Sequence, residues 1–362
     1  MPDRNEVAAQ IRVLVDQRVA LETKLQNEHG EISESGSQAY EQQYSGIQRK
    51  LATLFRVATE DGQRITIMLE LMRILENRMV YLQNFTVDPT SDSRILAQLV
   101  TQFIDQLAGQ SSSVLTKLEA TYYRAVAALH AGDISTARAG FSEACASEES
   151  DEANDIKYKS YVILGHLSHD EHDYVKAKDL HDQSMRYSQN NNVTAQALAL
   201  KALNSYALGD ADEALHLFGE ALQRFDPNQP FFNSYFFRNA LLFCGAIHFD
   251  RRDYADAGTF YRRVLEHVEP NSYDSFDALT HLGRIAYAQE HYDQAVESFE
   301  KAVRTHRFGE NEYLVDTWFW IARAHLKRND SRQARPYLEK IAATDVKYDK
   351  KPQAVAMLQK IA

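Results

Sequence analysis

The chain has 362 residues, of which 44% are hydrophobic and 25% charged, as in a soluble protein that buries a sizeable core in one large or two ordinary domains. With only 14 glycines and 7 prolines, a turn-rich β-sandwich, a collagen-like chain and a low-complexity segment are all disfavoured, which leaves a mostly helical protein. The net charge of −11 disfavours nucleic acid as a partner, and no apolar run is long enough for membrane insertion. Because the 2 cysteines form neither a disulfide framework nor a metal-binding motif, we expect a cytoplasmic protein.

The N-terminal part of the chain shows the apolar periodicity of packed helices. Apolar side chains recur three and four residues apart over 7–25, 40–58 and 65–82, and this heptad spacing is typical of helices that bury one seam. A further helix is expected from about 95 to 107, after a turn-forming segment. We therefore predict a helical bundle or coiled coil over residues 1–110, whose seams are buried either within the chain or in a homodimer.

Residues 113–362 repeat a pattern of paired helices. An alanine that opens the second helix of each repeat recurs at intervals of 37 to 43 residues, and a large side chain usually follows it four residues later. Short polar turns such as GDIS and RDYA separate the two helices, as a helical hairpin requires. The aligned alanines are Ala137, Ala177, Ala214, Ala257, Ala295 and Ala334.

These residues resemble the tetratricopeptide repeat (TPR) family, whose pattern is W-x2-L-G-x2-Y followed by A-x3-F and a late proline. Residues 279–302, LTHLGRIAYAQEHYDQAVESFEKA, match it closely, whereas the second repeat has His181 and the sixth has Leu338 in place of the aromatic residue. The layout resembles a bacterial-type TPR protein with an N-terminal helical bundle. The resemblance implies an all-α fold, a right-handed α-α superhelix of about six helix pairs over 113–362, with a capping helix that begins near Lys351.

In the TPR family the first helix of each repeat lines a concave groove, which implies a binding surface here. Counting one helical face through the repeats gives a groove that is apolar in its middle and basic at its far end. Residues 301–362 hold 13 Lys and Arg against 7 Asp and Glu, so the expected partner is a protein or peptide with acidic residues. Alternatively, the N-terminal helices cover part of the groove. The predicted partner-binding residues are Tyr122, Val162, His166, Leu203, Asn239, Leu242, Arg284, Tyr287, Phe319, Arg323 and Lys327.

A second candidate binding surface is the aromatic run FFNSYFF at residues 231–237. Aromatic side chains that are half exposed at a helix entrance often form interaction hot spots. The alternative interpretation, which is slightly favoured, is that the run packs against a neighbouring repeat. The aromatic patch consists of Phe231, Phe232, Tyr235, Phe236 and Phe237.

The sequence holds little that suggests catalysis. A glycine-rich phosphate loop, a G-x-S-x-G elbow and an H-E-x-x-H motif are all absent, so we expect no enzymatic activity and no cofactor. His166 and His169 lie three residues apart on a helix and, with Asp170, are spaced to share a metal ion. Histidine and aspartate are also common as caps and surface residues near such a turn, and we expect no metal site.

The sequence therefore favours a non-enzymatic scaffold or adaptor that holds a peptide or helix of a partner protein in the TPR groove. The layout also resembles the Rap-type bacterial regulators, in which the repeats sense a peptide and the N-terminal bundle acts as the effector. A third interpretation is a structural coiled-coil dimer whose repeats merely stack. A chaperone-tail adaptor is not expected, because Tyr122 and His166 stand where the family's carboxylate clamp requires Lys and Asn.

Overall fold

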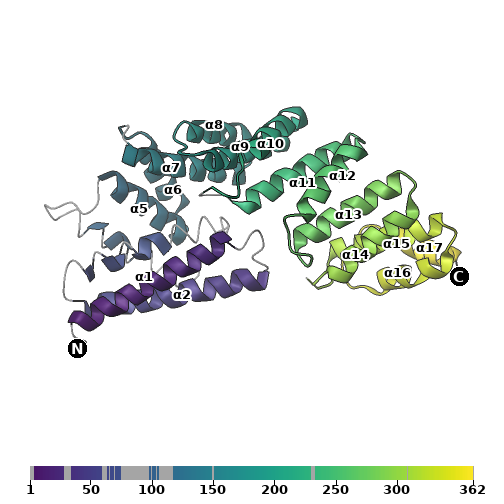
Figure 1. The fold of residues 1–362 in the computed structure, drawn as a ribbon, viewed down its shortest axis with the longest axis horizontal. Coiled ribbons are helices and arrows are strands. Elements are labelled where there is room, and N and C mark those ends of the chain that lie inside the picture. The colour runs from purple at the N-terminus through teal and green to yellow at the C-terminus, as the bar shows by residue number, and fades with distance from the viewer. Residues whose placement is uncertain are drawn as a thin grey trace. The chain divides into compact units, whose positions relative to one another are not determined.

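The computed structural model shows a chain built of helices wherever it is described (Figure 1). Contacts divide the chain into two compact units, an N-terminal unit that ends at Asn233 and a C-terminal unit that begins at Ser234. No helix in the described part is both long and apolar enough to cross a membrane. The described residues are 4–27, 34–58, 63–64, 66–68, 70–74, 98, 100–102, 104–105, 117–148, 151–229, 233–307 and 309–361.

The N-terminal unit begins with two long helices, α1 (Arg4–Asn27) and α2 (Glu34–Val57). Both bury the seams that the heptad spacing predicts, and Met68 and Met72 of the third predicted seam are buried as well. Because these seams are covered within one chain, they need no second copy to exclude water. The homodimer stays a prediction. The buried seam residues are Val7, Ile11, Leu14 and Leu21 of α1, and Tyr44, Ile47, Leu51 and Leu54 of α2.

The N-terminal helices share one hydrophobic core with the first repeats. Leu14 and Leu51 belong to the same buried cluster as Tyr122, Phe141 and Leu164. The predicted boundary near residue 110 lies outside the described residues, so the division into a bundle and a repeat domain stays a prediction. What the shared core shows is that the first helix pairs do not bury their apolar faces alone.

Six helix pairs follow in the described chain, as the repeat spacing predicts. From α5 onwards every helix packs on the next along the chain within its unit, and α17 (Lys351–Lys360) packs on α16 as the predicted capping helix. These elements confirm an all-α, TPR-like solenoid. The pairs are α5 (Lys117–Ala131) with α6 (Ile134–Cys145), α7 (Asp151–Asp170) with α8 (Tyr174–Met185), α9 (Asn191–Ala207) with α10 (Ala211–Arg224), α11 (Ser234–Asp250) with α12 (Tyr254–Leu265), α13 (Tyr273–Ala288) with α14 (Tyr292–Thr305), and α15 (Glu312–Lys327) with α16 (Ser331–Ala343).

In several pairs a ring of the second helix fills a slot opposite a glycine of the first. A Cβ atom added at Gly283 would lie 2.6 Å from the Phe299 ring, and one added at Gly245 would lie 2.9 Å from the Tyr261 ring. Glycine therefore sets how closely the two helices approach, and the ring fills the space between them. The aligned alanines of all six second helices are also completely buried.

We expect Phe299→Ala to lower the free energy of unfolding by about 3–5 kcal/mol, because it empties a slot that the backbone at Gly283 cannot collapse into. Val175→Ala is the control, since Val175 is 59% exposed and its truncation should cost less than about 0.5 kcal/mol. Urea unfolding followed by circular dichroism measures both variants. Equal losses of unfolding free energy in the two variants would contradict the claim that the Phe299 ring fills a tightly packed slot.

The turn inside each pair passes through a left-handed residue just before the second helix. Gly132 and Gly209 supply it with φ of 82° and 84°. The other four turns use a residue other than glycine, with φ of 62° at His172, 66° at Arg252, 64° at Glu290 and 60° at Asn329. A side chain with a Cβ atom has a steric cost of about 1–2 kcal/mol in this conformation, although asparagine adopts it more readily than other residues. The turns at His172, Arg252 and Glu290 therefore keep a strain that the two glycine turns lack.

Arg252→Gly should accordingly raise the free energy of unfolding by up to about 1 kcal/mol, once the greater freedom of glycine in the unfolded chain is subtracted. Gly209→Arg should lower it by a similar amount, and because a Cβ atom there meets nothing within 4 Å, the loss reports the backbone alone. Thermal unfolding of both variants measures the pair of changes. Shifts of the same sign would show that the turn conformation is not the cause.

Candidate functional site

The basic end of the predicted groove lies in the C-terminal unit, where α13 and α15 pack side by side (Figure 1). Both are the first helices of their pairs. Asp316, Trp320 and Arg323 lie four and three residues apart on α15 and so share one face of that helix. The segment between α16 and α17 reaches the same place with Tyr348 and Lys350.

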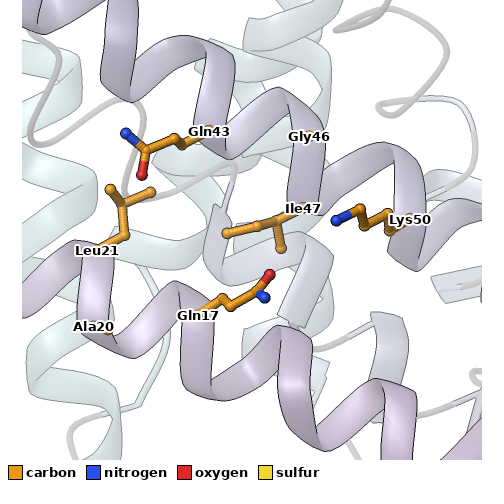
Figure 2. A pocket seen from close by; sticks show the side chains of 7 residues that line it. All are labelled: Gln17, Ala20, Leu21, Gln43, Gly46, Ile47 and Lys50. Atoms are coloured by element: carbon orange, nitrogen blue, oxygen red, sulfur yellow. The ribbon is translucent and has the colours of Figure 1, made fainter.

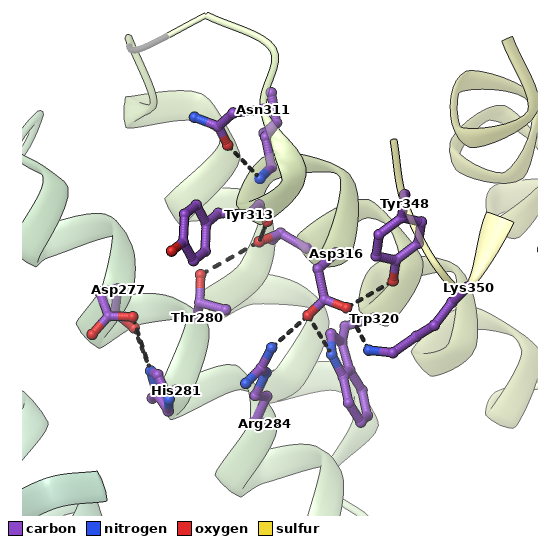
Figure 3. Close-up of polar contacts among 12 residues, drawn as sticks. Asp277, Thr280, His281, Arg284, Asn311, Tyr313, Asp316, Trp320, Tyr348 and Lys350 are labelled. Carbon is purple, nitrogen blue, oxygen red and sulfur yellow. Dashed lines mark hydrogen bonds and ion pairs between the residues drawn. The ribbon is translucent and has the colours of Figure 1, made fainter. Parts of the chain in front are cut away.

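Asp316 is at the centre of this arrangement (Figure 3). Its Oδ1 accepts hydrogen bonds from the Tyr348 hydroxyl at 2.7 Å and the Lys350 ammonium at 2.6 Å, and its Oδ2 accepts from Trp320 Nε1 at 3.0 Å and from Arg284 Nη2. Burial raises the pKa of Asp316, but the hydrogen bonds from Lys350 and Tyr348 and the charge of Arg284 outweigh it and hold that pKa below its usual value. A charged carboxylate therefore ties α13, α15 and the segment before α17 together.

Three cations lie against the indole ring of Trp320. The distances to its ring centroid are 4.7 Å from the guanidinium carbon of Arg323, 5.6 Å from that of Arg284 and 5.9 Å from the ammonium of Lys350. The guanidinium of Arg323 also lies 5.1 Å from the Tyr287 centroid and 5.8 Å from that of Phe319. Such contacts attract the cation to the ring face and fix its position. The cation–aromatic cluster is the set Arg284, Tyr287, Asp316, Phe319, Trp320, Arg323 and Lys350.

The charges of this cluster do not balance. Arg284 and Lys350 both pair with Asp316, and Arg323 forms an ion pair with no carboxylate of the described chain. Three positive groups and one negative group leave a surplus of two positive charges. Lys327 lies one helical turn beyond Arg323 and is exposed. The arrangement can therefore bind an anionic group, and its aromatic rings offer an apolar wall beside that group.

The structure brings together four of the residues predicted to bind a partner, namely Arg284, Tyr287, Phe319 and Arg323. Phe319 is only 1% exposed and lies beneath the cations, and Tyr122 is 2% exposed in the core of the N-terminal unit, so neither offers the surface that the helical count predicts. Both are buried because their first helices are packed on more than one side, which the helical count did not take into account. The remaining predicted residues, which are half-buried on other first helices, are Val162, His166, Leu203, Asn239 and Leu242.

Sequence reasoning missed Asp316, Trp320, Tyr348 and Lys350. Asp316 and Trp320 share the helix face of Arg323, so the same helical count applied one turn earlier would have found them. No such signal exists for Tyr348 and Lys350, because they come from a non-helical segment whose path follows from packing rather than from periodicity.

The aromatic patch is only partly within the described residues. Phe231 and Phe232 lie outside them. Tyr235 is 37% exposed, Phe236 is half-buried, and Phe237 is buried with its ring edge-on to His267 at 5.0 Å between centroids. Phe237 therefore serves packing, and a binding role for the other members stays a prediction.

The predicted histidine pair lies in the second helix pair, close to a third histidine. The rings of His166 and His181 are 5.5 Å apart between centroids, and His169 Nδ1 lies 2.9 Å from Asn204 Oδ1. Within the described chain no group of three or more His, Cys, Asp or Glu side chains is arranged to hold a metal ion. His181 takes the slot opposite Gly165 and is 1% exposed, and neither ring nitrogen has a hydrogen-bond partner among the residues that the structure describes.

Burial, followed by the nearby His166 and His169, holds the pKa of His181 well below 6.5, and burial lowers the pKa of His166 to about 4. Below pH 6.5 the unfolded chain therefore binds protons that the folded chain does not, so stability falls as the pH drops from 6.5 towards 4. His181→Phe, which supplies the ring that Phe141, Phe218 and Phe299 place in this slot, should raise stability and flatten this dependence.

Urea midpoints at neutral pH and at about pH 5 check the expectation, since a histidine with an ordinary pKa charges between them. His216→Phe makes the same change at an exposed site and is the control. A pH slope as steep in His181→Phe as in the unchanged protein would show that the buried histidine does not cause the acid sensitivity.

A cavity of about 420 Å³ lies between α1 and α2 (Figure 2). A Cβ atom added at Gly46 would meet nothing within 4 Å, which is why the wall is open there. None of the described lining residues is a histidine, cysteine or acid, and Lys50 is the ionisable group among them. Its lining residues are Gln17, Ala20, Leu21, Gln43, Gly46, Ile47 and Lys50.

Comparisons with known proteins agree with this architecture. Residues 237–307 match the family model described as tetratricopeptide repeat. The fold is similar to that of a signal transduction ATPase (STAND) protein with a tetratricopeptide repeat sensor from Pyrococcus horikoshii, at a TM-score of 0.55 and 14% identity over 88% of this chain and 49% of that one. A comparison with curated protein sequences found no match.

Two further solved structures are similar to parts of the chain. BtubC from P. vanneervenii has a TM-score of 0.49 and 17% identity over 68% of this chain and 93% of its own. YrrB, described as a TPR protein with an unusual peptide-binding site, has a TM-score of 0.44 and 15% identity over 61% of this chain and 96% of its own.

The packed helix pairs of each unit and the match over residues 237–307 define a helical-repeat protein that carries tetratricopeptide repeats over the matched residues. Tetratricopeptide repeats are in general scaffolds for protein interactions, and the match supports that general role here.

Proposed function

We propose that this protein is a scaffold that binds an acidic segment of a partner protein on the cation–aromatic cluster of α13 and α15. The observation that carries the proposal is Arg323. Its guanidinium lies among three aromatic rings and forms an ion pair with no acid of the described chain. Partial burial of a guanidinium without a carboxylate costs free energy, and a carboxylate of the partner would offset this cost by forming the ion pair.

The geometry of α15 suggests how the segment lies. Arg323 and the exposed Lys327 are four residues apart, so both cations point from the same face of the helix. A partner segment that runs along this face meets two positive groups in succession. The rings of Tyr287 and Trp320 lie beside them and accommodate an apolar side chain next to each acid.

Preorganisation makes such a contact stronger than an ordinary surface ion pair. An exposed pair contributes only about 0–1 kcal/mol, partly because two long side chains must be ordered. Here the rings already hold Arg323, and Asp316 already holds Arg284 and Lys350, so binding orders little that is not ordered beforehand.

We expect Arg323→Glu to weaken binding of acidic segments by more than about tenfold, because a charge-assisted contact is replaced by repulsion. The probe is a fluorescent peptide library with fixed glutamates spaced four residues apart, compared with a matched library that carries glutamine instead. Fluorescence anisotropy with the full-length protein gives the affinities.

Lys301→Glu makes the same charge reversal on α14, at an exposed lysine of the same unit outside the cluster, and should leave the affinity within about twofold. Two results contradict the proposal. One is equal binding of the glutamate and glutamine libraries, and the other is equal loss in the two charge-reversal variants.

The other predictions about function lack a supporting observation. The Rap-type alternative, with the repeats as sensor and the N-terminal bundle as effector, stays a prediction, as do the structural dimer, the cytoplasmic location and a groove covered by the N-terminal helices. The cation–aromatic cluster is formed by the C-terminal unit alone. Its proposed role therefore depends on none of them.

A further inference from the structure

The cation–aromatic cluster carries more positive charge than one carboxylate neutralises. Arg284 and Lys350 share the single carboxylate of Asp316, and Arg323 pairs with no carboxylate of the described chain, which leaves two positive charges. One glutamate or aspartate of a partner would remove only one of them. A ligand group with a double negative charge matches the cluster better.

The cluster also has hydrogen-bond donors to spare. Arg284 uses Nη2 for Asp316, and its buried Nε has no hydrogen-bond partner among the described residues. Lys350 gives Asp316 one hydrogen bond and is 44% exposed, so its ammonium can donate further. Lys350 is therefore a donor that an acceptor on the surface can reach.

These donors border the same rings. Each of the three cations lies within 5.9 Å of the Trp320 centroid, and Arg323 and Lys350 also lie 5.8 Å and 5.5 Å from the Phe319 centroid. Asp316 does not compete for a ligand at these rings, because four donors hold its carboxylate where it is. A phosphoryl group on serine or threonine carries about −1.5 to −2 charges at pH 7 and three strong acceptor oxygens.

We propose that the cation–aromatic cluster recognises a phosphorylated serine or threonine in the partner's segment, so that phosphorylation of the partner strengthens binding. This inference rests on the proposed function, since it specifies which anionic side chain the same surface prefers. The phosphoryl group accepts hydrogen bonds from Arg323 and Lys350, and the segment around it lies along α15 over the rings of Tyr287 and Trp320.

The test uses three peptide libraries that differ only at one central position, which is phosphoserine, glutamate or serine. Full-length protein is titrated with each, and anisotropy gives the affinity. Trp318→Phe leaves Trp320 as the single tryptophan, so its fluorescence reports directly whether the ligand reaches the cluster. We expect the phosphoserine library to bind at least about tenfold more tightly than the glutamate library, and the serine library to bind most weakly.

Two lysine substitutions then test whether the second surplus positive charge causes the preference for phosphoserine over glutamate. Lys350→Gln removes an exposed cation and should bring phosphoserine affinity close to glutamate affinity, whereas Lys301→Gln, a matched change outside the cluster, should leave the preference intact. Far-ultraviolet circular dichroism and the urea midpoint confirm that each variant is folded.

The outcomes distinguish this inference from the proposed function. Equal binding of the phosphoserine and glutamate libraries, both above serine, overturns the preference for phosphate and leaves the acidic-segment scaffold standing. Equal binding of all three overturns both. Free phosphoserine that binds as tightly as the phosphoserine library also overturns the inference, because the site would then hold a small phosphate rather than a protein segment.

Discussion

The close approach of two helices across a glycine, filled by a ring from the second helix, is the contact on which the solenoid depends. At Gly283 there is no room for a Cβ atom beside Phe299, and the same holds at Gly245 beside Tyr261. A slot of this kind fixes the spacing within a pair, and the spacing within a pair fixes where the next first helix packs. The position of α15 beside α13, and with it the cation–aromatic cluster, follows from these contacts.

Asp316 fixes the positions of the charged side chains that this helix packing brings together. Helix packing alone would leave three cations repelling one another around Trp320. One buried carboxylate with four donors holds two of those cations in place and draws in the segment that precedes α17. Arg323 is held instead by ring faces, which orient it without neutralising its charge. The result is a surface that is ordered before binding and still positively charged, as recognition of an anion requires.

The sequence was sufficient for the fold because its strongest signals are periodic. The aligned alanines located all six pairs, and the segment that begins near Lys351 indicated the capping helix. Even His181 and Leu338, which depart from the family pattern, are buried at the expected position. The site was predicted in part. Arg284, Tyr287 and Arg323 follow from a helical count, whereas Tyr348 and Lys350 depend on the path of a loop and the burial of Phe319 depends on what packs over it. Neither property repeats along the chain.

Hydrogen–deuterium exchange of the full-length protein, with and without a saturating acidic or phosphorylated peptide library, tests most directly whether the cation–aromatic cluster is where partners bind. The account predicts slower exchange in α15 and in the segment from α16 to α17, with α1 and α2 unchanged, because the ligand contacts Arg323 and Lys350. Protection confined to α1 and α2, around the cavity at Gly46, would contradict the account and assign binding to the N-terminal helices.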